Sequence, residues 1–87
     1  MTITLYTTPR CSQCRMTKLK LGKLGLAYTT VDLSKSPMDM AAVKELGYSQ
    51  APVVIAHIDG LDLHWSGFRP DMLDEIAARL NRAEATA

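Results

Sequence analysis

The sequence TTPRCSQC, residues 7–14, decides the fold of this chain and points to its chemistry. The five residues before it, 2–6, alternate polar and apolar side chains, which predicts a short strand. The residues that follow, up to position 24, are good helix formers, and Gly25 is placed to end that helix. The two cysteines are therefore predicted at the point where a strand passes into a helix.

Three more strands are predicted along the chain. Residues 26–33 are rich in Tyr, Thr and Val, which favours a second strand. Pro52 opens a continuous apolar run at residues 53–56 that fits a strand buried on both faces. The dipeptide Asp59-Gly60 is a hairpin signal, and it joins this run to a last strand over residues 61–65.

Two more helices are predicted. Ser36 can cap the first of them, with Pro37 at its first position and Asp39 completing a capping-box variant; this helix ends near Gly47. Pro70 opens a last helix, whose apolar residues recur at helical spacing up to position 80.

The order βαβαββα predicts an α/β fold, with a four-stranded mixed sheet flanked by three helices. The first two strands, joined by a helix, are expected to be parallel, and the last two to form an antiparallel hairpin. We expect a single domain over residues 1–80 and a frayed tail over residues 81–87. In this frame, a C-x-x-C between the first strand and the first helix is typical of a thioredoxin-like redox motif.

Composition restricts the function further. The 87 residues are 47% hydrophobic and 22% charged, as in one small globular domain. A formal net charge of +1 argues against a nucleic-acid or anionic-membrane binder. No apolar run approaches the roughly 18 residues of a membrane span, and no export signal is recognisable at the N-terminus. We therefore expect a cytoplasmic protein.

Cys11 and Cys14 are predicted to act as a redox pair. Cys11 lies at the start of the predicted helix, where unpaired backbone N–H groups and the helix dipole stabilise an anion. Arg10 and Arg15 add positive charge, so we expect the pKa of the Cys11 thiol to lie below its free value of about 8.5. Cys14 lies further into the helix and is expected to be less exposed. Cys11 is therefore the predicted nucleophile and Cys14 the resolving thiol.

Two other interpretations of the cysteines stay open. The first makes both of them small core residues. The second makes them ligands of zinc or of an iron–sulfur cluster, within one chain or between two chains. The chain holds only two histidines, His57 and His64, and no second C-x-x-C, which disfavours a site within one chain. Both histidines are expected on the surface of the hairpin.

Three segments resemble the NrdH-redoxins, small glutaredoxin-like proteins of the thioredoxin superfamily. The resemblance extends from residue 2 to about residue 80. Its segments are CSQC at residues 11–14, QAPVV at residues 50–54 and WSGFRPD at residues 65–71. The seven-residue signature at the expected place makes this resemblance specific, and it implies the thioredoxin fold.

The resemblance implies a function. NrdH-redoxins donate electrons to the catalytic subunit of class Ib ribonucleotide reductase, and thioredoxin reductase reduces them with NADPH. By this resemblance the chain is a thiol–disulfide oxidoreductase without a bound cofactor or metal, and we expect it to act as a monomer. Cys11 would attack the disulfide of the reductase, and Cys14 would resolve the mixed disulfide.

The resemblance also implies supporting residues. Pro52, if cis as in the family, would place backbone groups beside Cys11, and Arg69 and Asp71 are candidates for a hydrogen-bond network that fixes their loop. Trp65, as a single aromatic at a strand end, is more typical of a core. The residues expected to support the active site are Arg10, Ser12, Gln13 and Pro52. Those expected to bind a partner or shape the loop are Ala51, Trp65, Ser66, Gly67, Phe68, Arg69 and Asp71.

The sequence departs from glutaredoxins that use glutathione. These commonly carry C-P-Y-C and a Gly-Gly followed by a polar or acidic residue, where this chain has Ser12-Gln13 and a Ser-Gly-Phe at residues 66–68. Many NrdH-redoxins carry Val or Met in place of Ser12, a position that tunes the thiolate and the contact with the partner. A glutathione-dependent glutaredoxin and a metal- or cluster-binding protein without enzymatic activity are the alternative functions.

Overall fold

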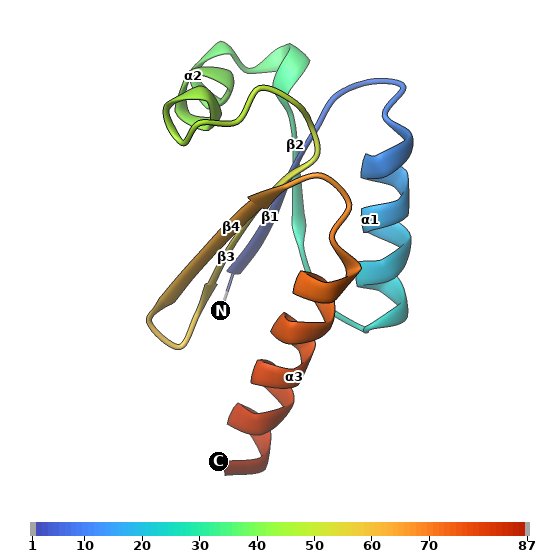
Figure 1. Cartoon of the computed structure of the whole chain (residues 1–87), viewed down its shortest axis with the longest axis vertical. Coiled ribbons are helices and arrows are strands. Elements are labelled where there is room, and N and C mark those ends of the chain that lie inside the picture. The colour runs from blue at the N-terminus through green and yellow to red at the C-terminus, as the bar shows by residue number, and fades with distance from the viewer. Residues whose placement is uncertain (1, 87) are drawn as a thin grey trace.

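The computed structural model describes residues 2–86, and the side chains of residues 2–81. Its helices and strands follow one another in the predicted order (Figure 1). They are β1 (Thr2–Thr7), α1 (Ser12–Lys23), β2 (Thr29–Asp32), the 3-10 turn η1 (Leu33–Lys35), α2 (Pro37–Glu45), β3 (Val53–Ile58), β4 (Leu61–Ser66) and α3 (Pro70–Thr86).

The four strands form one mixed sheet in the order β2-β1-β3-β4. β1 and β2 are parallel, whereas β3 is antiparallel to both β1 and β4. The register places Thr7 opposite Asp32, and Val53 opposite both Tyr6 and Ser66. The ends of β1, β2 and β4 and the start of β3 therefore meet at one edge of the sheet. This arrangement confirms the predicted fold.

The sheet is covered on both faces. Figure 1 shows α1 and α3 on one side of the sheet and α2 at the other. The alternation of β3 serves both faces, because Val54, Ala56 and Ile58 belong to the larger core cluster and Val53 to the smaller one. Removing such side chains from water contributes about 1.5–3 kcal/mol for each large one. The larger cluster joins the sheet to α1 and α3 through Leu21, Leu73 and Ile76.

Gly25 ends α1 as predicted, and the way it does so delays the next strand. Gly25 has φ 70, and its N–H donates to Gly22 O while the N–H of Leu26 donates to Leu21 O. These two bonds form the Schellman motif that satisfies the last helical carbonyls. Leu26 is thereby tied to the helix, and β2 begins at Thr29 rather than at position 26.

Two other predicted helix ends differ in the structure. Ser36 is the N-cap of α2 but makes no side-chain capping bond; its hydroxyl donates instead to the carboxylate of Asp39. α3 continues to Thr86, through most of the segment predicted to be a frayed tail, because residues 81–86 contain no Gly or Pro to end the helix. Position 87 lies outside the described residues.

Candidate active site

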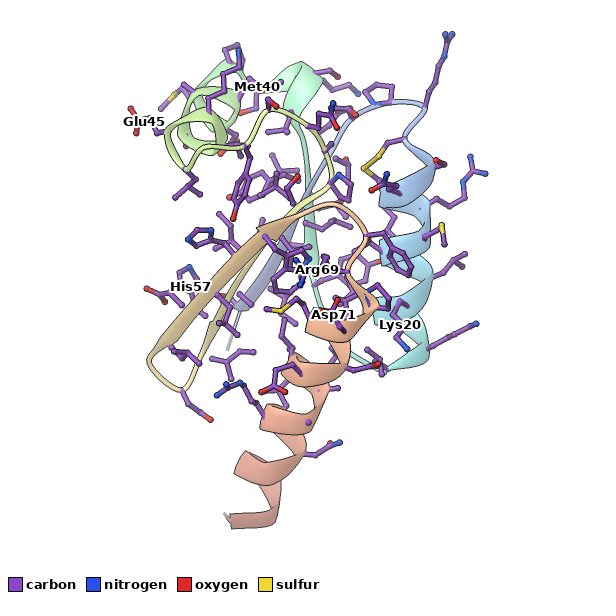
Figure 2. The ribbon with its side chains drawn as sticks, in the orientation of Figure 1. Lys20, Met40, Glu45, His57, Arg69 and Asp71 are labelled. Carbon is purple, nitrogen blue, oxygen red and sulfur yellow. A yellow bond between two sulfur atoms is a disulfide. The ribbon has the colours of Figure 1, made fainter. Side chains whose placement is uncertain are left out.

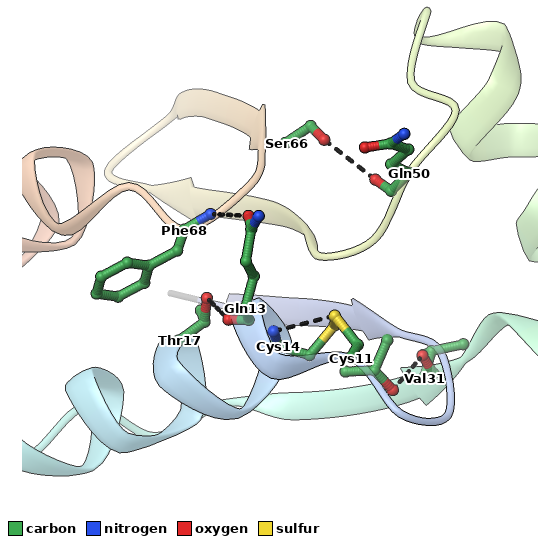
Figure 3. The surroundings of a disulfide bond; sticks show 9 residues. Cys11, Gln13, Cys14, Thr17, Val31, Gln50, Ser66 and Phe68 are labelled. Carbon is green, nitrogen blue, oxygen red and sulfur yellow. Dashed lines mark hydrogen bonds between the residues drawn. A yellow bond between two sulfur atoms is a disulfide. The ribbon is translucent and has the colours of Figure 1, made fainter.

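The two cysteines lie at the sheet edge where β1 passes into α1. Cys11 is the N-cap residue of α1, with extended backbone angles of φ −101 and ψ 107. Cys11 and Cys14 form a disulfide, and their Cα atoms are 5.2 Å apart (Figure 3). Cys11 is half-buried, whereas Cys14 is only 3% exposed. The predicted difference in exposure between the two cysteines is therefore present.

The sulfur of Cys11 occupies the position of a capping oxygen. The backbone N–H of Cys14 donates to Cys11 Sγ at 3.1 Å, and the first turn of α1 holds no acidic residue. A helix N-terminus with free N–H groups favours a negative charge at this point. The local geometry therefore favours the anionic form of the Cys11 sulfur when the disulfide is reduced.

The loop before β3 brings Pro52 to the same edge. The Ala51–Pro52 peptide bond is cis, as the resemblance implied. Pro52 is buried, and its carbonyl accepts a hydrogen bond of 2.8 Å from the N–H of Gly67. Because β3 pairs with β4, this bond continues the sheet into the loop that follows β4.

The loop after β4 is tied to both neighbouring loops. Ser66 Oγ donates to the carbonyl of Gln50 at 3.0 Å. The N–H of Phe68 donates to Gln13 Oε1 at 3.1 Å, a bond between residues 55 positions apart (Figure 3). Gly67 has φ 88, a backbone conformation that favours glycine. Hydrogen bonds therefore join three segments beside the disulfide, residues 11–14, 50–52 and 66–68, and we call this set the junction.

The rest of the WSGFRPD segment divides between the core and the surface. Trp65 is 4% exposed and belongs to the larger core cluster. It can therefore support the loop at residues 66–68 by packing in the core, but it offers no surface to a partner. Phe68 is half-buried and lines a shallow groove with Met16 and Leu19 of α1. Arg69 and Asp71, both labelled in Figure 2, are exposed and form an ion pair.

Arg69 and Asp71 form the predicted hydrogen-bond pair. The Arg69 guanidinium donates from Nε to Asp71 Oδ1 at 3.0 Å and from its terminal nitrogen to Oδ2 at 2.8 Å. These bonds hold the pKa of Asp71 below its ordinary value and raise the pKa of Arg69. The pair thus stays charged in neutral solution and fixes the entry into α3.

Two grooves flank the disulfide and differ in charge. The groove on the α1 and β2 side has a volume of about 370 Å³; we call it the cationic groove. Its polar and charged lining includes Arg10, Cys11, Cys14, Arg15, Lys18 and Asp32. The groove on the β3 side has a volume of about 400 Å³; we call it the amide groove. Its lining includes Cys11, Ser12, Gln13, Ser49, Gln50 and Ala51, and Arg10 lines both grooves.

Several groove residues have no role in the sequence analysis, among them Lys18, Asp32 and Ser49. Lys18 lies four residues after Cys14, hence on the same side of the helix, which is a signal that could have located it. Asp32 reaches the site because the parallel pairing of β1 and β2 places it opposite Thr7.

The histidines lie away from the cysteines. Both are exposed on the β3–β4 hairpin, as predicted, and Figure 2 shows His57 there, away from the disulfide. His57 contacts Asp62, and His64 Nδ1 is hydrogen bonded to the hydroxyl of Tyr48 at 2.7 Å. Within residues 2–86, no three His, Cys, Asp or Glu side chains gather in a way that could hold a metal ion. Over the same range, no helix has the length and hydrophobicity needed to cross a membrane.

The sheet order, the N-capping Cys11 and the buried Cys14 define a thiol–disulfide oxidoreductase with a thioredoxin fold. The glutaredoxin family model matches residues 3–60. The glutaredoxin-like protein NrdH of Escherichia coli K12 is 38% identical over 85 residues, which cover 98% of this chain and all of that protein. The NrdH protein of Lactococcus lactis subsp. cremoris is 32% identical, over 86% of this chain and 99% of that protein.

A solved structure agrees with these relatives. NrdH-redoxin from Escherichia coli, a glutaredoxin-like protein described as having a thioredoxin-like activity profile, superposes with a TM-score of 0.79. It is 39% identical, and the match covers 87% of this chain and 95% of that one. The chain therefore belongs to the glutaredoxin family, in its group of NrdH glutaredoxin-like proteins.

Proposed function

We propose that this chain is an electron carrier to the catalytic subunit of class Ib ribonucleotide reductase, and that thioredoxin reductase re-reduces it with NADPH. The proposal places the protein in the cytoplasm as a monomer. The observation that carries it is the unequal exposure of two bonded cysteines at a helix N-terminus, Cys11 half-buried and Cys14 3% exposed. Membership of the NrdH group supports the choice of partners.

In the proposed reaction, Cys11 attacks first. Its thiolate forms a bond to one sulfur of the partner's disulfide, which breaks, and the released partner thiolate takes up a proton. Cys14 then loses its proton and attacks Cys11 Sγ. The Cys11–Cys14 disulfide forms, and the second partner sulfur leaves as a thiolate that is protonated in turn. Two electrons have passed from this protein to the partner.

The supporting residues have distinct proposed roles. The N–H of Cys14 and the N-terminus of α1 stabilise the Cys11 thiolate. Ala51 lines the amide groove, where an extended partner segment would align against its backbone. Pro52, buried and hydrogen bonded to Gly67, would hold Ala51 in that position. Gln13 and the loop at residues 66–68 hold that groove in shape.

The loop at residues 66–68 favours thioredoxin reductase over glutathione as the source of electrons. The N–H of Phe68 already donates to Gln13, so this backbone donor is engaged within the protein rather than open to a small anionic thiol such as glutathione. The thioredoxin-like activity profile described for the Escherichia coli relative supports the same choice.

The proposal is tested with two reducing systems in parallel. The oxidised protein is offered NADPH with thioredoxin reductase, or NADPH with glutathione and glutathione reductase, and NADPH consumption that depends on this protein is measured. We expect turnover in the first system, and then reduction of the disulfide of a class Ib reductase catalytic subunit. Turnover mainly in the second system would contradict the proposal and identify a glutathione-dependent glutaredoxin.

A further inference from the structure

The cationic groove holds basic side chains that the fold does not use. Arg10, Arg15 and Lys18 are all exposed, and none of the ion pairs found within residues 2–81 includes them. The remaining charge in the groove is Asp32, which accepts hydrogen bonds from the N–H and the hydroxyl of Ser34. These bonds lower the pKa of Asp32, so that the groove carries three cations against one carboxylate at neutral pH.

Two of these three cations, Arg15 and Lys18, come from α1. The helix carries four basic residues and no acidic one, although the whole chain has a net charge of only +1. Two basic residues outside the groove are paired: Lys20 of the same helix contacts Asp74 at 3.1 Å, and Arg79 contacts Glu75. Arg10, Arg15 and Lys18 thus place three cations without an ion pair together on the flank of the disulfide.

The surroundings of the groove indicate a large occupant. Along α1, next to the groove, Met16 is 48% exposed and Leu19 is 61% exposed, and they share a shallow groove with Phe68. A molecule that reaches Cys11 across α1 therefore meets cations and an exposed apolar patch on one helix. A protein surface can cover both at once, whereas a small thiol can reach only the groove.

We propose that the cationic groove receives acidic side chains that lie beside the reactive disulfide of a protein partner. The proposal rests on the proposed function in one respect, because Cys11 must react with a protein disulfide. Carboxylates match the free guanidinium and ammonium groups, and complementary charge speeds the encounter and selects the partner more than it tightens the complex. Since the groups are exposed, added salt weakens the effect.

Two synthetic peptides test the proposal. Both contain the same Cys-x-x-Cys disulfide, and one has two Glu on each side where the other has Gln. The second-order rate constant for reduction of each peptide by the reduced protein is measured. At about 20 mM NaCl we expect the acidic peptide to react about tenfold faster, and at about 1 M NaCl the ratio of the two rate constants should approach one.

A pair of variants locates the effect. Lys18→Gln should lower the ratio of the two rate constants about threefold at low salt, because it removes one cation from the groove. Lys44→Gln is the matched control: it removes the same charge from an exposed position on α2 and should keep the ratio. Taking the ratio cancels any effect of Lys18 on the reactivity of the Cys11 thiolate. Circular dichroism verifies that both variants are folded.

Equal rate constants for both peptides in the wild type would overturn the proposal, and so would an equal loss of the ratio in both variants. Reduction of glutathione disulfide is measured as well. The proposal is also overturned if Lys18→Gln lowers the rate constant for glutathione disulfide as much as that for the acidic peptide. This last result would assign the groove to small carboxylates instead. A wild-type protein that reduces neither peptide would contradict the proposed function itself, and this inference with it.

Discussion

The two flanks of the disulfide are built in different ways. The amide groove is lined by the segments that precede and begin α1 and that precede β3. Hydrogen bonds tie both segments to the loop after β4, through Gln13 and Phe68, Pro52 and Gly67, and Gln50 and Ser66. The cationic groove is lined by exposed basic side chains, Arg15 and Lys18 from α1 and Arg10 from the loop before it. The first flank can recognise a partner by shape and backbone hydrogen bonds, the second by charge. One sulfur, Cys11, is common to both.

The largest effect is expected from a variant that removes the Cys11 sulfur, which both flanks share. Cys11→Ser should abolish NADPH consumption with thioredoxin reductase, because serine is not nucleophilic toward a disulfide at neutral pH. Cys14→Ser should retain the first attack and accumulate a mixed disulfide with the partner, seen as an adduct by mass spectrometry. An adduct formed through Cys14 in the Cys11→Ser protein would reverse the assigned roles.

The next largest effect is expected from a variant that breaks a hydrogen bond on the amide-groove side of the disulfide. Gln13→Leu removes the acceptor of the Phe68 N–H, which should cost about 1 kcal/mol in the free energy of unfolding. It should also raise the KM for thioredoxin reductase about fivefold, because the loop at residues 66–68 is no longer held. Urea unfolding and steady-state kinetics measure the two quantities.

A neighbouring variant is the control for Gln13. Ser12→Ala changes an exposed side chain of the same C-x-x-C, which lines the groove but makes none of the hydrogen bonds that join the three segments of the junction. Its free energy of unfolding should change by less than about 0.5 kcal/mol. If Ser12→Ala is destabilised as much as Gln13→Leu, the bond to Phe68 does not hold the loop.

A smaller effect is expected on the cationic flank. Arg15→Gln should lower kcat/KM for an acidic protein disulfide about threefold at low ionic strength. The loss should disappear at about 1 M salt, where exposed charges are screened over about 3 Å. The same salt series on Gln13→Leu should leave its defect in place, because that defect does not depend on charge. A salt-insensitive loss in Arg15→Gln would remove the contrast between the flanks.

The smallest effect concerns pH. Arg69 lowers the pKa of Asp71, so the carboxylate is more acidic in the folded than in the unfolded protein. This contribution to stability is therefore present above the ordinary Asp pKa of 3.8 and is lost as the pH falls through the lower, folded value. Asp71→Asn should reduce stability slightly at pH 7 and flatten its acid dependence, as urea unfolding at several pH values would reveal. An unchanged acid slope would contradict this.

The fold could be predicted from the sequence because its signals are local. The alternation in β1, the apolar run of β3, the Asp59-Gly60 turn and Gly25 each act over a few residues and agree with one another. The helix boundaries were less predictable. The start of β2 depends on the hydrogen bond from Leu26 to Leu21, and the end of α3 on the absence of a stop signal.

The candidate site could be predicted only in part. The two cysteines and Pro52 carry recognisable motifs, and the structure places them at the same end of the sheet. Asp32 joins them through strand register, which the sequence does not specify, and Trp65 is withdrawn into the core although its segment reaches the surface. Lys18 resembles any solvated lysine until the groove beside it is known.

The bond between Gln13 and Phe68 has a consequence for transplanting this active site. It joins an acceptor in one motif to a donor 55 positions away in another. A graft of CSQC alone into a related scaffold would carry the acceptor without the loop that presents its donor. A graft of the WSGFRPD segment alone would carry a backbone N–H that lacks its glutamine. The two motifs form a single exchangeable module, and swaps between redoxins should respect that unit.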